Sequence, residues 1–127
     1  MPKEIIAPEN VHRARGYSHA IKCGNTIYVA GQIALDEKGK LVGESDVVAQ
    51  TGRAYENLKR VLEAAGASMS DIVVMHVYTM DLEGFKKTWE IGRKYFGTYS
   101  PAITVIGVVG LYEPGTIIEI EAIAVVD

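Results

Sequence analysis

The 127-residue sequence contains a single cysteine, Cys23, and this scarcity excludes a disulfide bond within the chain. Proteins of oxidising compartments commonly carry disulfides, so a lone thiol agrees with a reducing compartment. The first residues have no apolar core of signal-peptide length, and they include an early acid at Glu4. We therefore expect a cytoplasmic protein in which Cys23 is chemically inert.

Long apolar runs and an excess of positive charge are also missing. The uncharged stretch over residues 98–112 is interrupted by Pro101, Gly107 and Gly110. It is shorter than the roughly 20 apolar residues that span a bilayer. There are 13 Lys and Arg against 16 Asp and Glu, for a net charge of −3, whereas nucleic-acid-binding proteins usually carry a basic patch. These features disfavour both a membrane protein and a nucleic-acid partner.

Common cofactor and metal signatures do not occur either. Residues 107–110, Gly-Val-Val-Gly, are too short and too apolar for a dinucleotide-binding turn, and there is no phosphate-binding loop pattern. The histidines His12, His19 and His76 lack metal-ligand spacing, and Cys23 has no second cysteine beside it. No nucleophile-elbow motif is present. We therefore expect neither a metal ion nor an organic cofactor.

The most informative stretch is the last one, from Thr116 to Val126, which alternates with the period of a β-strand. Every second residue from Ile118 onward is apolar, which predicts that this side lies on a core. The other side carries two carboxylates, Glu119 and Glu121, among Ile and Val. Because they are two residues apart on a strand, they project on the same side with Cα atoms about 6.5–7 Å apart. Either both pair with Lys or Arg on neighbouring strands, or one holds a water beside a bound small molecule.

Four more segments have strand patterns. Gly24-Asn25 is typical of a two-residue hairpin turn between the first two. Gly31 interrupts the second of them, which predicts a bulge or a site where another group approaches the backbone closely. Residues 1–16 show no such pattern, and we expect them to be irregular. The predicted strands cover residues 18–23, 26–34, 72–80 and 102–109.

Two segments repeat their apolar residues at helical spacing. The first is capped by Ser45 or Asp46 and ends at Gly66, a residue type that readily adopts the left-handed conformation. The second is capped by Asp81 and ends at Gly97. The polar side of the first helix is predicted at Gln50, Arg53, Glu56, Asn57, Arg60 and Glu63, and the buried stripe of the second at Leu82, Phe85, Trp89, Gly92, Tyr95 and Phe96.

The element order is β-β-α-β-α-β-β, so crossover connections must reach part of the sheet. We predict a single domain over residues 1–127. Its class is α+β, an α/β two-layer sandwich in which one mixed sheet carries both helices on one face. The other face also contains Ile and Val, and the simplest cover for it is another copy of the same chain.

Five segments of the sequence are distinctive together: GYSHAIKCGN at 16–25, AGQI at 30–33, ENLKRVLEAAG at 56–66, SPA at 100–102 and IEIEAIAV at 118–125. In this order they resemble the RidA/YjgF family. Members of this family hydrolyse reactive enamines and imines, and they have also been described as L-PSP endoribonucleases or translation initiation inhibitors. The resemblance covers nearly the whole chain and implies a chorismate-mutase-like fold, a homotrimer, and small-molecule clefts between neighbouring subunits.

The working residues of the family can be placed on this sequence one by one. The resemblance implies that Tyr17 is the cleft tyrosine, that the Gly31 N–H donates to a substrate carboxylate, and that Glu119 holds the attacking water. Two positions of the same cleft depart from the family pattern. The usual serine before Gly-Gln is Ala30, and the usual asparagine of the second helix falls near Trp89.

The largest departure follows Pro101-Ala102, where the arginine that clamps the substrate carboxylate is Ile103. A guanidinium can make two charge-assisted hydrogen bonds to a carboxylate, so their loss weakens binding by about 2–5 kcal/mol, roughly 30-fold to several thousand-fold. Arg15 and His19 flank Tyr17 and are candidate replacement cations. For Arg15 we favour the alternative, a loop side chain that faces solvent.

Three functions are consistent with these residues. The first is hydrolysis of a small imine, enamine or related carbonyl compound, in which Glu119 orients water, Tyr17 bonds the substrate and the Gly31 N–H stabilises developing negative charge. The second is binding of a less acidic metabolite without turnover, which Ile103, Ala30 and Trp89 favour because they make the cleft more apolar and aromatic. The third is action on RNA, which the acidic composition disfavours.

Overall fold

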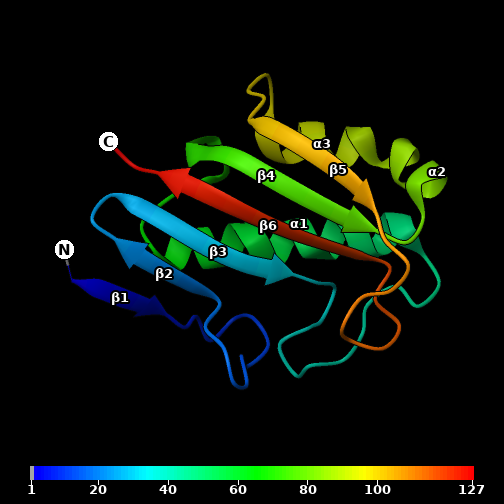
Figure 1. The fold of residues 1–127 in the computed structure, drawn as a ribbon, viewed down its shortest axis with the longest axis horizontal. Helices are drawn as coiled ribbons and strands as arrows, with labels where there is room; N and C mark the ends of the chain where they lie inside the picture. Colours follow the sequence, from blue (N-terminus) through cyan, green and yellow to red (C-terminus); the bar gives the residue numbers. More distant parts are fainter. Residues whose placement is uncertain (1) are drawn as a thin grey trace.

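The computed structural model describes residues 2–127, and its centre is one six-stranded sheet (Figure 1). The order across the sheet is β1-β2-β3-β6-β4-β5. Only β4 and β5 run parallel among these neighbours, so the predicted mixed sheet is confirmed. The strands are β1 (Lys3–Ile6), β2 (Ala20–Cys23), β3 (Thr26–Gln32), β4 (Ile72–Thr79), β5 (Ala102–Gly107) and β6 (Ile118–Val125).

The last strand, β6, lies between β3 and β4 in the middle of the sheet. Its predicted core side is confirmed, because Ile118, Ile120, Ala122 and Ala124 are all buried. Burying an isoleucine side chain contributes roughly 1.5–3 kcal/mol, so this side of β6 supplies a substantial part of the core. The alternate side of the strand is half-buried and carries the two glutamates.

Both helical regions lie on one face of the sheet, which confirms the two-layer arrangement (Figure 1). The Asp46 carboxylate caps α1 (Val47–Ala64) by accepting a hydrogen bond from the Ala49 N–H at 3.1 Å. The second region, predicted as one helix, is divided into α2 (Leu82–Phe85), the 3-10 turn η2 (Lys86–Thr88) and α3 (Trp89–Phe96). A further 3-10 turn, η1 (Met69–Asp71), precedes β4.

The prediction of irregular structure over residues 1–16 is wrong for Lys3–Ile6, which form the edge strand β1. These residues pair antiparallel with β2, with Ile5 opposite Ile21 and Ile6 opposite Ala20. Four residues are too few to show a strand period, and hydrogen bonds to a neighbouring strand decide their conformation.

Two amides of α1 contradict the prediction that they lie on its polar side, because Gln50 and Asn57 are fully buried. The Asn57 Nδ2 donates to the carbonyls of Ile33 and Leu35 at 2.8 and 2.9 Å, and the Gln50 Oε1 accepts from the Ile117 N–H at 2.8 Å. These bonds satisfy backbone groups that would otherwise be buried without partners. The helix thereby holds the loop that leaves β3 and the loop that enters β6.

The stripe predicted to be buried on the second helical region is only partly covered. Trp89 is 59% exposed and Leu82 is 45% exposed. Both lie beside β5, whose six residues are all exposed in this single chain. Side chains at this edge therefore remain available for contacts beyond the chain itself.

The sheet face away from the helices carries an apolar row. The cross-strand register places Ile5, Ile21, Tyr28, Ile123 and Val74 side by side. Ile5 is 67% exposed and Tyr28 is 51% exposed, so the row has no cover from the described residues. Those residues also include no helix both long enough and apolar enough to cross a membrane.

Candidate functional site

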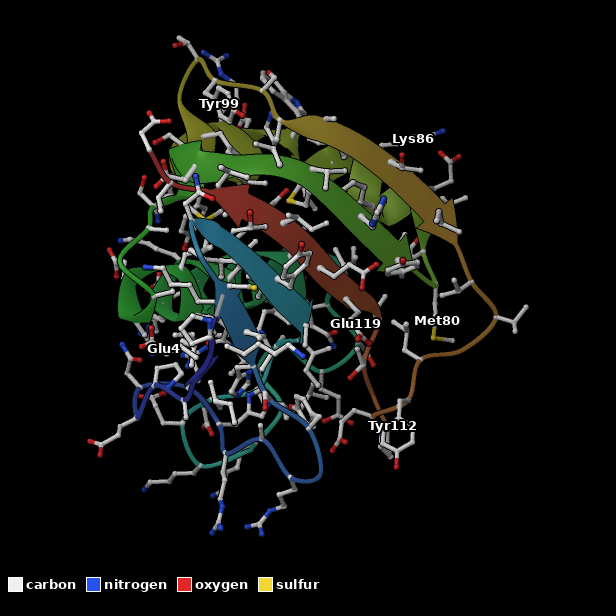
Figure 2. All side chains as sticks on the ribbon, turned by 60° about the vertical axis from the view of Figure 1, so that its left-hand side comes forward. Glu4, Met80, Lys86, Tyr99, Tyr112 and Glu119 are labelled. Atoms are coloured by element: carbon white, nitrogen blue, oxygen red, sulfur yellow. The ribbon has the colours of Figure 1, made fainter. Side chains whose placement is uncertain are left out.

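A hollow of about 740 Å³ opens at the end of the sheet where β3 finishes and β6 begins. Five of the residues selected from the sequence line it, namely Tyr17, Ala30, Gly31, Glu119 and Arg15. Figure 2 shows Glu119 at this end of β6, on the same side of the molecule as the loop that carries Tyr112. The N-terminal loop, the loop after β3 and the loop before β6 supply the rest of the wall.

The Glu119 side chain lies directly over the backbone of Gly31. A Cβ atom added to Gly31 would meet the Glu119 Cδ at 2.6 Å and its Cγ at 2.7 Å, distances that real side chains do not adopt. The pairing of β3 with β6 shifts register between Val29 and Gln32, which confirms the predicted bulge. Glycine at this position therefore makes room for the carboxylate.

Glu119 is a half-buried carboxylate without a hydrogen-bond partner among residues 2–127. Burial, followed by the negative charge of Glu121, raises the pKa of Glu119 above its ordinary value, because both disfavour the ionised form. A raised pKa makes the ionised carboxylate a stronger base, so Glu119 accepts a proton from water more readily than an ordinary glutamate does. Its oxygens are free to hold such a water in the hollow.

Glu121 lies on the same side of β6 as Glu119, but its carboxylate has hydrogen-bonding neighbours on β4. Its Oε1 accepts a hydrogen bond from the Tyr78 hydroxyl at 2.6 Å and lies 3.3 Å from the His76 Nδ1. The alternative in which both glutamates pair with Lys or Arg is therefore wrong, since the neighbours are a tyrosine and a histidine. Of the two carboxylates, Glu121 is held by side chains of β4 and Glu119 faces the hollow.

His19 does not face the hollow, and the prediction that it could meet a ligand as a cation is wrong. Its ring is 2% exposed and is engaged on both sides. The Nε2 donates to the His12 carbonyl at 2.6 Å, and the Nδ1 accepts from the Gln32 side-chain amide at 3.2 Å. A histidine held in this way supports the loop beneath Tyr17.

Three cationic side chains border the hollow: Arg13, Arg15 and Lys38. Arg15 is exposed, in agreement with a loop side chain that faces solvent, and it also borders the hollow. Tyr112 and His12 also line it. Sequence reasoning selected neither of these two nor Lys38, because loop residues carry no periodicity that would reveal which way they point.

Trp89 and Ile103 lie elsewhere, beside a second hollow of about 530 Å³ between the α2–α3 region and β5. Ile103 of β5 lies opposite Met75 of β4, whose side chain is buried in the core. The Ile103 side chain is therefore on the helix side of the sheet. Within one chain these two residues do not meet Glu119. The described residues also bring together no group of three or more His, Cys, Asp or Glu side chains that could hold a metal ion.

The fold and the hollow define a class of small α+β protein with a glutamate and a tyrosine at one end of a mixed sheet. The family model described as Endoribonuclease L-PSP matches residues 8–126, nearly the whole chain. The chain therefore belongs to this family, which includes the RutC and RidA/YjgF proteins.

Individual relatives align along their full length. A RutC family protein of Pyrococcus abyssi is 46% identical over 98% of both chains. The 3-aminoacrylate deaminase RutC of Acinetobacter baylyi is 35% identical, again over 98% of both, and a 2-iminobutanoate/2-iminopropanoate deaminase of Dermatophagoides farinae is 31% identical over 99% of this chain and 98% of its own. The solved structure of the Rid-family protein YyfA from Yersinia pestis superposes with a TM-score of 0.92 at 33% identity, covering 98% of this chain and all of that one.

Proposed function

We propose that this protein hydrolyses a small imine or enamine metabolite in the hollow that contains Tyr17, Gly31 and Glu119. The observation that carries this proposal is the position of Glu119, whose unpartnered carboxylate with a raised pKa lies over a glycine backbone and faces an open space. Relatives named as deaminases of 3-aminoacrylate and of 2-imino acids support it.

The reaction adds one water to the C=N bond and releases ammonia and a carbonyl compound. Glu119 orients the water and takes its proton as the oxygen attacks carbon, and that proton reaches the nitrogen. The hydroxyl proton of the tetrahedral intermediate then moves to the nitrogen, the C–N bond breaks to release ammonia, and the oxygen forms the carbonyl double bond. Tyr17 hydrogen-bonds the substrate, and the Gly31 N–H meets a carboxylate or a developing negative charge. An enamine enters the same route after a proton is transferred to its carbon.

We assign the recognition of an anionic substrate group to Arg15. It borders the same hollow as Glu119 and Tyr17, whereas position 103, where the family pattern has arginine, is isoleucine. A guanidinium makes planar, paired contacts with a carboxylate that an ammonium cannot reproduce. Arg15 would therefore compensate for part of the missing clamp from the N-terminal loop.

A homotrimer is part of the proposal. The uncovered apolar row on the sheet and the exposed edge strand β5 are surfaces that a second copy of the chain would bury. Ile103 and Trp89 of one subunit would then line the cleft that contains Glu119 of the next. Sedimentation equilibrium should return three times the chain mass, and a monomer mass would overturn this part.

The second hollow favours one alternative, which is binding of a less acidic metabolite without turnover. Its walls are mainly apolar and aromatic, with Trp89, Tyr99 and Ile103 among them. A ligand seated against such walls gains from apolar contact rather than from charge pairing. A ligand screen that prefers 2-oxo acids over neutral compounds would contradict this alternative.

The decisive assay generates 2-iminopropanoate with an amino-acid oxidase and follows its disappearance above the spontaneous rate. Wild type is compared with Glu119→Ala, Arg15→Ala and Ile103→Arg. We expect measurable turnover by wild type, loss in Glu119→Ala, and weaker apparent substrate binding in Arg15→Ala. Activity only in Ile103→Arg would mean that this protein has the cleft of its family but that the wild-type cleft is adapted to substrates other than 2-iminopropanoate. No activity in any variant, or full activity in Glu119→Ala, would overturn the hydrolase proposal.

A further inference from the structure

A histidine lies behind the hydroxyl of Tyr17, and the reaction proposed above leaves it without a role. The Nε2 of His12 is 3.1 Å from the Tyr17 Oη, and the ring is 5% exposed at the wall of the hollow. The His12 and His19 rings pack edge to face with their centroids 4.7 Å apart. Tyr17 therefore has a fixed polar neighbour on its buried side.

The hydrogen bonds around His19 determine which of its nitrogens carries the proton. A backbone carbonyl can only accept, so the bond of 2.6 Å to the His12 oxygen requires a proton on the His19 Nε2. The His19 Nδ1 is then an acceptor, and the Gln32 amide donates to it at 3.2 Å and to the Ala30 carbonyl at 3.1 Å. The end of β3 is in this way connected through His19 to the backbone of His12.

The proton on His12 has two possible positions, and the surroundings favour one. The Nδ1 is buried and has no hydrogen-bond partner among the described residues. A proton there would leave a buried N–H without an acceptor, an arrangement rarer in proteins than an unpaired acceptor. A proton on the Nε2 instead donates to the Tyr17 oxygen. The hydrogen of the Tyr17 hydroxyl is then free to point into the hollow.

We propose that His12 is a positioning residue that donates a hydrogen bond to the Tyr17 hydroxyl and thereby directs the Tyr17 hydrogen towards the ligand. His19 and Gln32 hold His12 in place. Tyr17 then meets the ligand as a hydrogen-bond donor, so the ligand must present an acceptor there, such as an imine nitrogen or a carboxylate oxygen. The consequence for turnover rests on the proposed function, whereas the tautomer and the hydrogen bond do not.

The charge state of His12 is compatible with this role. Burial, the neighbouring His19 and Arg53 of α1 lower the pKa of His12 from 6.5 to about 4, so the ring stays neutral near pH 7. Glu119, Glu113, Glu37, Arg13, Arg15 and Lys38 are the other charged residues bordering the same hollow. Because the Nε2 faces Tyr17, the neutral ring can donate this hydrogen bond only in the tautomer that carries its proton on Nε2.

The first test is long-range ¹H–¹⁵N NMR of the imidazole rings at pH 7, which distinguishes a proton on Nε2 from one on Nδ1 without any substrate. His12→Gln and His19→Gln variants assign the signals. We expect both rings to carry the proton on Nε2 and the His12 ring to remain neutral down to about pH 4. A His12 proton on Nδ1, or averaging of both tautomers, would overturn the inference even if the enzyme proved active.

The second test is kinetic and uses a double-mutant cycle. Losing one hydrogen bond of ordinary strength should lower kcat/KM by roughly 2- to 12-fold in His12→Leu. His12→Gln, whose amide can still donate to Tyr17, should retain most of the activity. In a Tyr17→Phe background, His12→Leu should have no further effect. An equal loss in both backgrounds would overturn the inference by assigning His12 a general structural role. If wild type shows no turnover, the proposed function fails while the NMR result still decides the hydrogen bond.

Discussion

One added methyl group at Gly31 tests whether the position of the Glu119 carboxylate carries the activity. In Gly31→Ala the new Cβ would overlap the Glu119 carboxylate and would lie 2.6 Å from its Cδ. The glycine does not have a positive φ, so alanine fits its backbone without strain. The substitution leaves both reacting side chains in the protein and changes only where one of them can lie.

The size of the effect follows from these distances. To reach ordinary contact at 3.4–4 Å, the Cδ must move by about 1 Å, and it can do so because Glu119 is the flexible partner. A displacement of about 1 Å in a reacting group can lower turnover by about 100-fold. The rotamer change costs about 0.5–1.5 kcal/mol, while alanine recovers about 0.4–1 kcal/mol by restricting the unfolded chain. We therefore expect a large loss of activity with a Tm within a few degrees of wild type.

The measurement is imine hydrolysis and thermal unfolding on the same preparations, with Gly52→Ala as the matched control. Gly52 lies within α1, and a Cβ added there meets nothing within 4 Å. The control should keep full activity and gain roughly 0.5–1 kcal/mol of stability, because alanine is the better helix former. Full activity in Gly31→Ala would refute the reasoning, and so would a fall in Tm large enough to explain the loss by unfolding.

Three further predictions concern charge and buried polar groups. Glu121→Gln removes a negative charge that raises the pKa of Glu119, so the acidic limb of the pH–rate profile should move to lower pH; an unmoved limb would show that Glu121 does not act on the essential base. His12 binds a proton at pH 6.5 when unfolded but only at about pH 4 when folded. The free energy of unfolding, measured in urea, should therefore decrease by about 3 kcal/mol at most as the pH falls from 6.5 to about 4. His12→Gln should make the free energy of unfolding less dependent on pH in this range. Asn57→Ala removes both donors to the buried carbonyls of Ile33 and Leu35, which should lower the free energy of unfolding by roughly 2–4 kcal/mol; a loss below 1 kcal/mol would mean that the loop finds other partners.

Local patterns in the sequence were sufficient for most of the sheet and for the helix ends. The alternation from Ile118 onward predicts β6 and its buried side, because successive side chains of a strand point to opposite faces. Asp46 and Gly66 mark the ends of α1, and the structure gives Gly66 a φ of +81°. Each of these features depends on residues that are neighbours in the chain, so the sequence contains the information directly.

Other features depend on contacts between distant segments, and the sequence did not reveal them. Lys3–Ile6 become a strand because β2 offers them an edge. The helical pattern predicts Gln50 on the solvent-facing side of α1. It is buried instead, because its side chain accepts a hydrogen bond from the Ile117 N–H in the loop next to β6. The same kind of pattern predicts Trp89 in the core. It is exposed instead, because no described element covers that end of β5. In each case the deciding partner lies far away along the chain.

The candidate site divides in the same way. The sequence alone placed two carboxylates on one side of a strand, and its family resemblance selected Tyr17, Gly31 and Glu119. Only the tertiary structure decided that Glu119 is free while Glu121 is paired, and that Arg15 and His12 border the same hollow. The physical reason is that the register between β3 and β6 and the course of three loops set these distances, and both result from packing of the whole sheet against α1.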